Sequence, residues 1–273
     1  NTLIVYGCEI CGPVLKESSN MIEWNLGDIL DAIEPAMPQD APALIHGDRI
    51  ITWPEMSARS NNVARALRQR GASDGAKVAF YMRNRPEYGE LMAACFKGRL
   101  THVNINYRYR PEEVFYIFDD SDSEVIIYSS EFRDCIVELK DRLGKVHTFV
   151  EIGDASQIAP FAIPYEILAQ EGDGSALGIT RSPDDLLFIY TGGTTGMPKG
   201  VMWRHDDMRK AQLDAQKLLG PVPQTVEENQ SRAGQTYTSL LPVNARDRLH
   251  HCDRHAHVGR CHRDSVGPIF RCA

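Results

Sequence analysis

Apolar residues in the middle of the chain recur with two different periods. The segment Thr52-Trp53-Pro54-Glu55 has the pattern of a helix-capping box, and Met56, Val63 and Leu67 follow it at helical spacing. Further helical patterns and short apolar runs typical of buried strands alternate after it. The expected helices are 86–97 and 111–118, and the expected strands are 77–82, 101–105, 124–128, 146–152 and 186–190. This alternation predicts an α/β fold with a largely parallel sheet.

The chain changes character twice. Residues 1–20 begin with Asn, whereas Met21 opens a stretch that is typical of a protein start. We therefore expect 1–20 to be an extension translated from upstream and 21–243 to be the folded unit. In residues 244–273 the apolar periodicity stops and Arg, His and Cys become frequent.

Two interpretations of residues 244–273 compete. Cys252, Cys261 and Cys272, with five nearby histidines, suggest a zinc-binding module, but they lack the close CxxC or HxxxH pairs of zinc fingers. Alternatively, codons for this segment can be chosen so that a neighbouring frame spells an apolar, Gly-punctuated string that begins MHGTG. We favour a frameshifted tail and assign no metal ligands.

Bulk composition narrows the classes of protein further. With 273 residues and 42% hydrophobic content the chain can bury a sizeable core. A net charge of −7 gives no electrostatic reason to expect a nucleic-acid partner. No apolar run approaches the ~20 residues that a transmembrane helix needs, and the start does not resemble a secretory signal. The odd count of seven cysteines argues against a disulfide framework. We expect a cytoplasmic protein.

A loop rich in glycine and threonine follows the expected strand 186–190. Glycines let a backbone turn with positive φ and approach a ligand closely, so that successive N–H groups can form an anion nest. Threonine hydroxyls and one lysine add donors for phosphate. The pattern predicts a binding site for the β- and γ-phosphates of ATP. The candidate binding residues are Thr191, Gly192, Gly193, Thr194, Thr195, Gly196 and Lys199.

This loop differs from the Walker P-loop. There Lys directly follows the second Gly and precedes Ser or Thr, whereas here Met197 and Pro198 intervene and Gly200 follows Lys199. A plain surface turn is the alternative interpretation. A turn rarely combines this many Gly and Thr residues with Pro and Lys directly after a buried strand, so we favour phosphate binding.

The segment YTGGTTGMPKGVMWRH, residues 190–205, resembles the phosphate-loop motif of the adenylate-forming superfamily. That superfamily comprises acyl-CoA synthetases, peptide-synthetase adenylation domains and luciferases. TWPEMSARSNNVARAL at 52–67, KVAFYMRNRP at 77–86 and VNINYRY at 103–109 are similar to further segments of it, the last in bacterial fatty-acyl-CoA synthetases. The resemblance covers residues 21–243 and implies a partial amino-terminal domain with layered sheets and helices.

The resemblance also implies a two-step reaction. A carboxylic acid, here a fatty acid, attacks the α-phosphate of ATP to give an acyl-adenylate, and the CoA thiol then displaces AMP. ATP and CoA are the expected co-substrates and magnesium the expected cofactor. Tyr190 is expected to pack at the strand end, and Trp203, Arg204 and His205 to open a surface helix. The pair Arg108 and Arg110 is expected to be a solvated face rather than a CoA site.

The family's remaining catalytic parts are a Glu that holds magnesium, an Asp for the ribose, a hinge and a carboxy-terminal Lys. None is found in this sequence, so we assign no catalytic residue and expect a truncated, inactive form of an acyl-CoA synthetase. Two alternatives stay open, a non-catalytic nucleotide-binding remnant and an adenylation domain that loads a carrier protein. By analogy, VNINYRY and VMWRH suggest a fatty or bulky acyl group.

Overall fold

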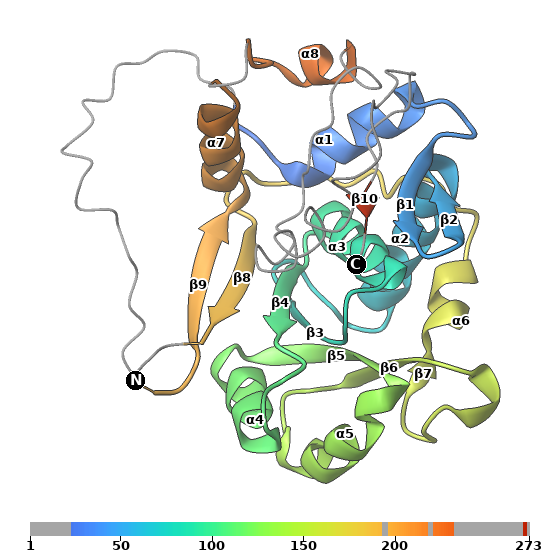
Figure 1. Cartoon of the computed structure of the whole chain (residues 1–273), viewed down its shortest axis with the longest axis vertical. Helices are drawn as coiled ribbons and strands as arrows, with labels where there is room; N and C mark the ends of the chain where they lie inside the picture. The colour runs from blue at the N-terminus through green and yellow to red at the C-terminus, as the bar shows by residue number, and fades with distance from the viewer. Residues whose placement is uncertain (1–22, 193–195, 218–220, 232–269, 272–273) are drawn as a thin grey trace, which may run out of the picture.

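The computed structural model describes residues 23–192, 196–217, 221–231 and 270–271, and a seven-stranded sheet forms its centre. Strand order is β7-β6-β5-β3-β4-β8-β9 (Figure 1). All neighbours from β7 to β8 are parallel, and β9 is antiparallel to β8. The strands are β3 (Lys77–Tyr81), β4 (Thr101–Ile105), β5 (Ser123–Ser129), β6 (Thr148–Ile152), β7 (Ile163–Pro164), β8 (Leu186–Thr191) and β9 (Lys199–Arg204). The largely parallel sheet expected from the sequence is confirmed.

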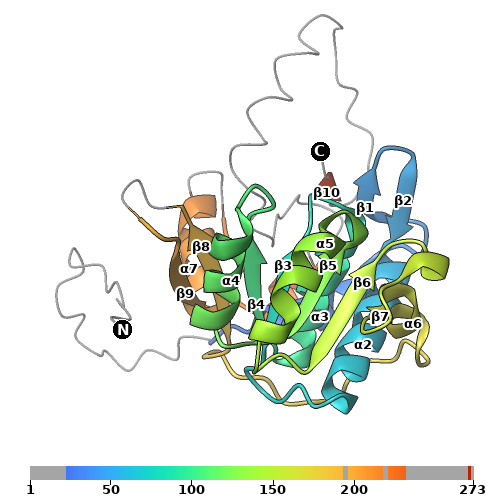
Figure 2. The ribbon, with the colours of Figure 1, turned by 90° about the horizontal axis from the view of Figure 1, so that it is seen from below.

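Helices cover both faces of this sheet (Figure 2). Val78 and Phe80 of β3 belong to a core shared with α1, α2, α3 and α6, whereas Ala79 and Tyr81 belong to a core shared with α4 and α5. The helices are α1 (Leu26–Ile33), α2 (Trp53–Gln69), α3 (Pro86–Gly98), α4 (Pro111–Asp120), α5 (Arg133–Leu139), α6 (Tyr165–Gln170), α7 (His205–Gln216) and α8 (Val226–Ser231). Burial on both faces explains why these strands are apolar runs rather than alternating patterns.

Short elements complete the described structure. A second sheet has the order β10-β1-β2, with β1 antiparallel to β2 and parallel to β10. Its strands are β1 (Pro42–His46), β2 (Arg49–Thr52) and β10 (Phe270–Arg271). The single-turn 3-10 helices are η1 (Glu34–Ala36), η2 (Ser130–Phe132), η3 (Lys140–Arg142) and η4 (Ala155–Gln157).

The helix starts follow the signals in the sequence. The Thr52 hydroxyl accepts a hydrogen bond from the Glu55 N–H at the start of α2, as the capping box predicted. Helices α3 and α4 both begin at proline, a residue whose fixed φ suits the first helical turn. At α4, the Glu113 carboxylate accepts from the Arg110 N–H at 2.9 Å. Local chemistry therefore sets where these three helices begin.

One charged pair lies inside the core between α3, α2 and η1. Lys97 has no exposed surface, and its ammonium donates to Glu34 at 2.6 Å and to the Ser60 hydroxyl at 3.2 Å. Burial lowers the pKa of Lys97, while the Glu34 carboxylate opposes this shift. The partner lies 63 residues earlier in the chain, so the helical pattern at 86–97 gave no indication of the pair.

The segment after the loop differs from the expectation. Trp203 and Arg204 do not open a helix; they end β9, and α7 begins at His205. Pairing of Trp203 with Leu187 places both side chains against the first core, which explains why the strand continues to this point. His205 is also fully buried, so α7 does not begin as a surface helix.

Two expected segments fall largely outside the described residues. These are the proposed extension 1–20 and, apart from Phe270 and Arg271, the tail 244–273. Within the described ranges, no helix combines the length and the apolar character that crossing a membrane requires.

Candidate functional site

The expected phosphate loop connects the two strands of the β8–β9 hairpin. The strands pair in antiparallel register from Leu186↔Arg204 to Thr191↔Lys199. Directly opposed residues of an antiparallel pair lie on the same face, and successive residues alternate between faces. Thr191 and Lys199 therefore share one face of the hairpin tip, and Tyr190 and Gly200 share the other.

The Thr191–Lys199 face is open to solvent. Both residues are exposed, and among the described residues no carboxylate pairs with the Lys199 ammonium. A hydroxyl and an ammonium on adjacent strands can bind one anion between them. Of the predicted binding residues, the structure describes Thr191, Gly192, Gly196 and Lys199. The other three, Gly193, Thr194 and Thr195, lie outside the described residues.

Gly192 passes close to the loop that follows β4. A Cβ atom added to Gly192 would lie 3.3 Å from the hydroxyl oxygen of Tyr109. Tyr109 belongs to a turn in which the Asn106 side chain accepts from the Arg108 N–H at 3.0 Å. Burial, together with the nearby Glu113 carboxylate, raises the pKa of Tyr109, so its hydroxyl stays protonated at neutral pH. No local pattern in the sequence indicates that Tyr109 borders the phosphate loop.

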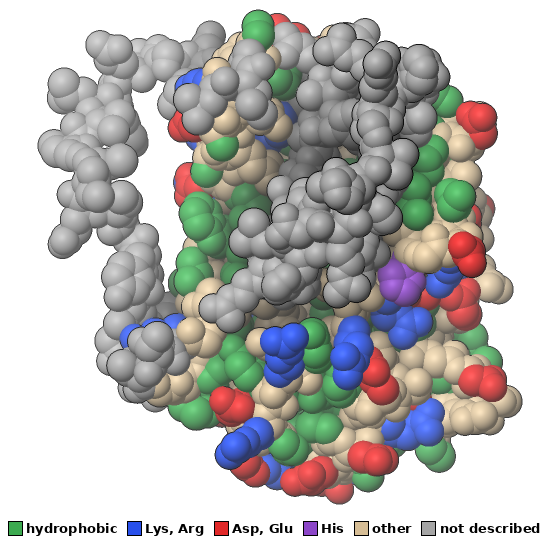
Figure 3. Space-filling model, viewed as in Figure 1, with side chains coloured by type: hydrophobic (Ala, Val, Ile, Leu, Met, Phe, Trp, Pro, Cys, Tyr) green, Lys and Arg blue, Asp and Glu red, His purple; other side chains and the backbone are tan. Residues whose placement is uncertain are grey.

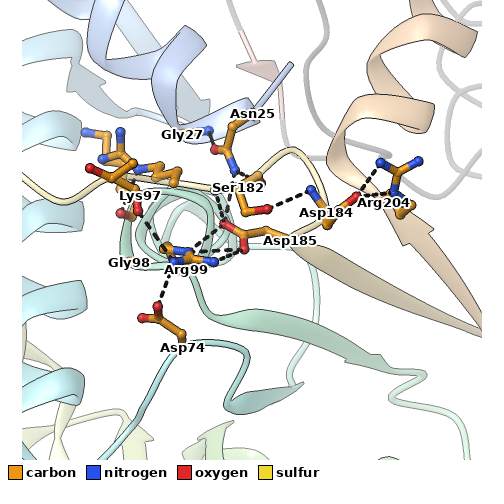
Figure 4. A network of polar contacts seen from close by, with 12 residues as sticks. Asn25, Gly27, Asp74, Lys97, Gly98, Arg99, Ser182, Asp184, Asp185 and Arg204 are labelled. Carbon is orange, nitrogen blue, oxygen red and sulfur yellow. Dashed lines mark hydrogen bonds and ion pairs between the residues drawn. The ribbon is translucent and has the colours of Figure 1, made fainter. Parts of the chain in front are cut away.

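A polar network holds the base of the hairpin (Figure 4). Asp185, directly before β8, accepts from the Arg99 guanidinium at 2.9 Å and from the Asn25 amide at 3.1 Å. The Asp185 carbonyl also accepts from the His205 N–H at 2.9 Å, and Arg204 pairs with Asp184. Residues before and after the hairpin are thereby connected to α1 and to the end of α3.

Tyr190 holds the tip of the hairpin. Its hydroxyl donates to Asp120 at the end of α4, and its N–H donates to the Asn104 side chain on β4, each at 2.7 Å. Burial and the Asp120 carboxylate raise the pKa of Tyr190, which keeps the hydroxyl a donor. The packing role expected for Tyr190 is confirmed, because it is 5% exposed in the second core. Its two polar contacts were not expected.

Basic side chains gather beyond the carboxyl ends of β3 and β4. The guanidinium groups of Arg83 and Arg108 lie 4.8 Å and 5.3 Å from the centre of the Tyr107 ring. Arg108 and Arg110 are exposed, which confirms the solvated face expected from the sequence. Figure 3 shows Lys and Arg side chains near the middle of this face and acidic side chains toward α4 and α5. Positive charge is therefore present on the same side of the molecule as the carboxyl ends of the parallel strands.

Carboxylates do not gather into a metal site in the described ranges. Among those residues, no group of three or more His, Cys, Asp or Glu could hold a metal ion. The candidate zinc ligands Cys252, Cys261 and Cys272 lie outside the described residues. The described part of the site is therefore a set of hydrogen-bond donors and one ammonium, which suits an anion.

Comparison with known proteins shows that the chain, including the hairpin, matches a protein family. A profile of AMP-binding enzymes matches residues 33–244. The 3-oxocholest-4-en-26-oate–CoA ligase of Rhodococcus rhodochrous is 36% identical over 187 residues, which are 67% of this chain and 34% of that protein. The medium-chain acyl-CoA ligase Mig of Mycobacterium avium is 30% identical over 233 residues, 78% of this chain and 42% of that protein.

A solved structure supports the same relationship. The fatty acyl CoA synthetase of Mycobacterium tuberculosis superposes with a TM-score of 0.60 at 25% identity, over 71% of this chain and 37% of that one. The chain spans about a third to two-fifths of the length of these relatives. The profile match covers the main sheet and its hairpin, in agreement with the resemblance of residues 21–243. The chain belongs to the family of AMP-binding enzymes, with the α/β fold of the adenylate-forming CoA ligases.

Proposed function

We propose that this chain carries the ATP-binding part of an AMP-forming acyl-CoA ligase. The observation that supports this most is the hairpin tip, where Thr191 and Lys199 are opposed on one exposed face at the ends of a Gly- and Thr-rich loop. A loop of this kind suits the β- and γ-phosphates of a nucleotide. We assign the nucleotide-binding unit to residues 21–243 and its phosphate contacts to the seven predicted loop residues.

In the proposed reaction, Thr191 and Lys199 stabilise negative charge that develops on the leaving pyrophosphate. When a carboxylate attacks the α-phosphate, negative charge develops on the departing pyrophosphate. The Lys199 ammonium and the Thr191 hydroxyl would stabilise that charge from the start, because the hairpin already holds them in place. Magnesium would neutralise phosphate charge when it enters with the nucleotide. The described residues provide no carboxylate cluster for it, so we assign it no protein ligands.

The proposed acyl substrate is a carboxylic acid with a large apolar body. Two relatives are named for a steroid acid and for medium-chain acyl groups. The segments VNINYRY and VMWRH support the same class by analogy. CoA is the proposed thiol acceptor. Because we assign only phosphate contacts within these residues, we propose that a polypeptide of this sequence binds ATP but forms little acyl-adenylate.

Calorimetric titration with ATP and with AMP tests the binding part of this proposal. If the loop binds the terminal phosphates, ATP should bind at least about tenfold more tightly than AMP, a difference of about 1.4 kcal/mol. Equal affinities would rule out the assigned phosphate contacts. Pyrophosphate exchange with a fatty acid or a steroid acid tests the chemical part. Rapid exchange by this chain would overturn the expectation of low adenylate formation.

A further inference from the structure

The hairpin tip has one exposed and one buried face. Thr191 and Lys199 lie on the exposed face, whereas Tyr190 lies on the other with 5% of its surface exposed. Adjacent positions of a strand point to opposite faces. Tyr190, which holds the hairpin, is therefore directly followed in the chain by Thr191, the first side chain on the face proposed to bind phosphate.

A hydrogen bond from the Tyr190 backbone connects β8 to β4 beyond the residues that pair in the sheet. The two strands pair at His102↔Leu187 and Val103↔Phe188. Two residues later, the Tyr190 N–H donates to the Asn104 side chain at 2.7 Å. A side chain of β4 thus takes the position that a backbone carbonyl would occupy in a regular sheet.

The Tyr190 hydroxyl attaches the hairpin to α4. It donates to one carboxylate oxygen of Asp120 at 2.7 Å, and Tyr116 donates to the other at 3.3 Å. Asp120 is the last residue of α4. A carboxylate is electrostatically disfavoured at the negative end of a helix. The two hydroxyl donors offset this cost, and one of them comes from the hairpin.

The Tyr190 ring also fixes β9. Tyr190 and Gly200 are directly opposed, and a Cβ atom on Gly200 would lie 2.8 Å from Cζ of the ring. The ring therefore covers the space where a side chain at position 200 would be. Because Lys199 is the preceding residue, the ring contact lies next to the residue that carries the ammonium.

We propose that Tyr190 is a positioning residue for the phosphate loop. It holds β8 and β9 against β4 and α4 through Asn104, Asp120 and Gly200, and so fixes Thr191 and Lys199 relative to each other. This role rests on the proposed function, because it assumes that these two residues bind the terminal phosphates of a nucleotide.

Hydrogen exchange of the ligand-free full chain tests the positioning role without any nucleotide. Tyr190→Phe keeps the ring over Gly200 and removes the bond to Asp120. Exchange in the hairpin, 186–204, should become about fivefold faster, as expected for the loss of one hydrogen bond, while exchange in β5 stays unchanged. Asp120→Ala should reproduce this effect, and Asp120→Asn, which keeps an acceptor, should stay near wild type. Tyr116→Phe is the matched control and should leave the hairpin unchanged.

Nucleotide titration of the same variants separates the two proposals. Tyr190→Phe should weaken ATP binding about fivefold and leave AMP binding unchanged. Unchanged hairpin exchange, or equally faster exchange in β5, would contradict the positioning role, as would faster hairpin exchange with unaltered ATP affinity. Faster hairpin exchange in a protein whose wild type binds no ATP would support the attachment by Tyr190 and overturn the proposed function instead.

Discussion

The parallel strands β3 to β6 and the β8–β9 hairpin are stabilised in different ways. Val78 and Ile127 of the parallel strands have no exposed surface, and helices pack on both faces of the sheet that these strands form. The hairpin tip is exposed at Thr191 and Lys199 and is held by polar contacts of Tyr190. Apolar packing therefore fixes the sheet, whereas a few hydrogen bonds fix the candidate site. Stability and ligand binding should then be separable by mutation.

The largest stability effect should come from the centre of the parallel strands. Ile127→Ala on β5 removes buried methyl groups and leaves a cavity, so the free energy of unfolding should fall by about 3 kcal/mol. Val137→Ala is the control, because Val137 is 46% exposed and its truncation should change stability by less than about 0.5 kcal/mol. Urea unfolding measures both values. A similar loss for the two variants would contradict the packing account.

A somewhat smaller loss of stability should follow from replacing Glu87 at the start of α3, and this loss should depend on pH. Burial would raise the pKa of Glu87, but hydrogen bonds from Arg85 and Arg49 outweigh it and lower the pKa to about 2. A folded-state pKa below the unfolded value of 4.5 stabilises the protein above pH 4.5 and loses that contribution as the pH falls toward 2. Glu87→Gln should therefore cost about 2 kcal/mol at pH 7.

Denaturant titrations at several pH values check this expectation. The stability difference between wild type and Glu87→Gln should shrink steadily below pH 4.5. Glu55→Gln is a suitable control, because Glu55 is exposed at the first turn of α2 and its side chain makes no ion pair among the described residues. A difference that is the same at pH 7 and pH 3 would show that the Glu87 charge is unimportant.

An effect of similar size should arise at the base of the hairpin, with a smaller difference between two replacements of Arg99. Arg99 adopts a left-handed conformation with φ 56° and binds both Asp185 and Asp74. Arg99→Ala should cost about 2 kcal/mol through these lost contacts. Arg99→Gly loses the same contacts but relieves the backbone, so it should be more stable than Arg99→Ala by about 1 kcal/mol. Thermal unfolding of the pair measures the difference, and the reverse order would contradict the assigned backbone strain.

The sequence predicted the sheet region well because its signals are local. Apolar runs marked β3, β4, β5, β6 and β8, and proline and capping residues marked the starts of α2, α3 and α4. The antiparallel partner β9 was missed, because its residues follow a turn and carry Lys199, Trp203 and Arg204 rather than a continuous apolar run. The two-stranded pairing of β1 and β2 was likewise not expected.

The contacts that hold the candidate site could not be predicted from local patterns. The loop residues themselves were recognisable from their Gly, Thr and Lys content. Asp120 and Asn104, however, are 70 and 86 residues from Tyr190 in the chain. Asp120 also lies beyond the helix 111–118 that the sequence predicts, although α4 extends to it. Only the fold, in which α4 ends beside β8, shows that this carboxylate faces the hairpin.

ATP affinity of Lys199→Ala, measured by calorimetry at fixed salt, tests the central claim most directly. Lys199 is exposed and makes no ion pair among the described residues, so its removal should change stability by less than about 0.5 kcal/mol. ATP binding should weaken about tenfold, with AMP binding unchanged and with Lys217→Ala as a control that binds like wild type. Equal ATP affinity of Lys199→Ala and wild type would contradict the assignment of this hairpin as the phosphate-binding site.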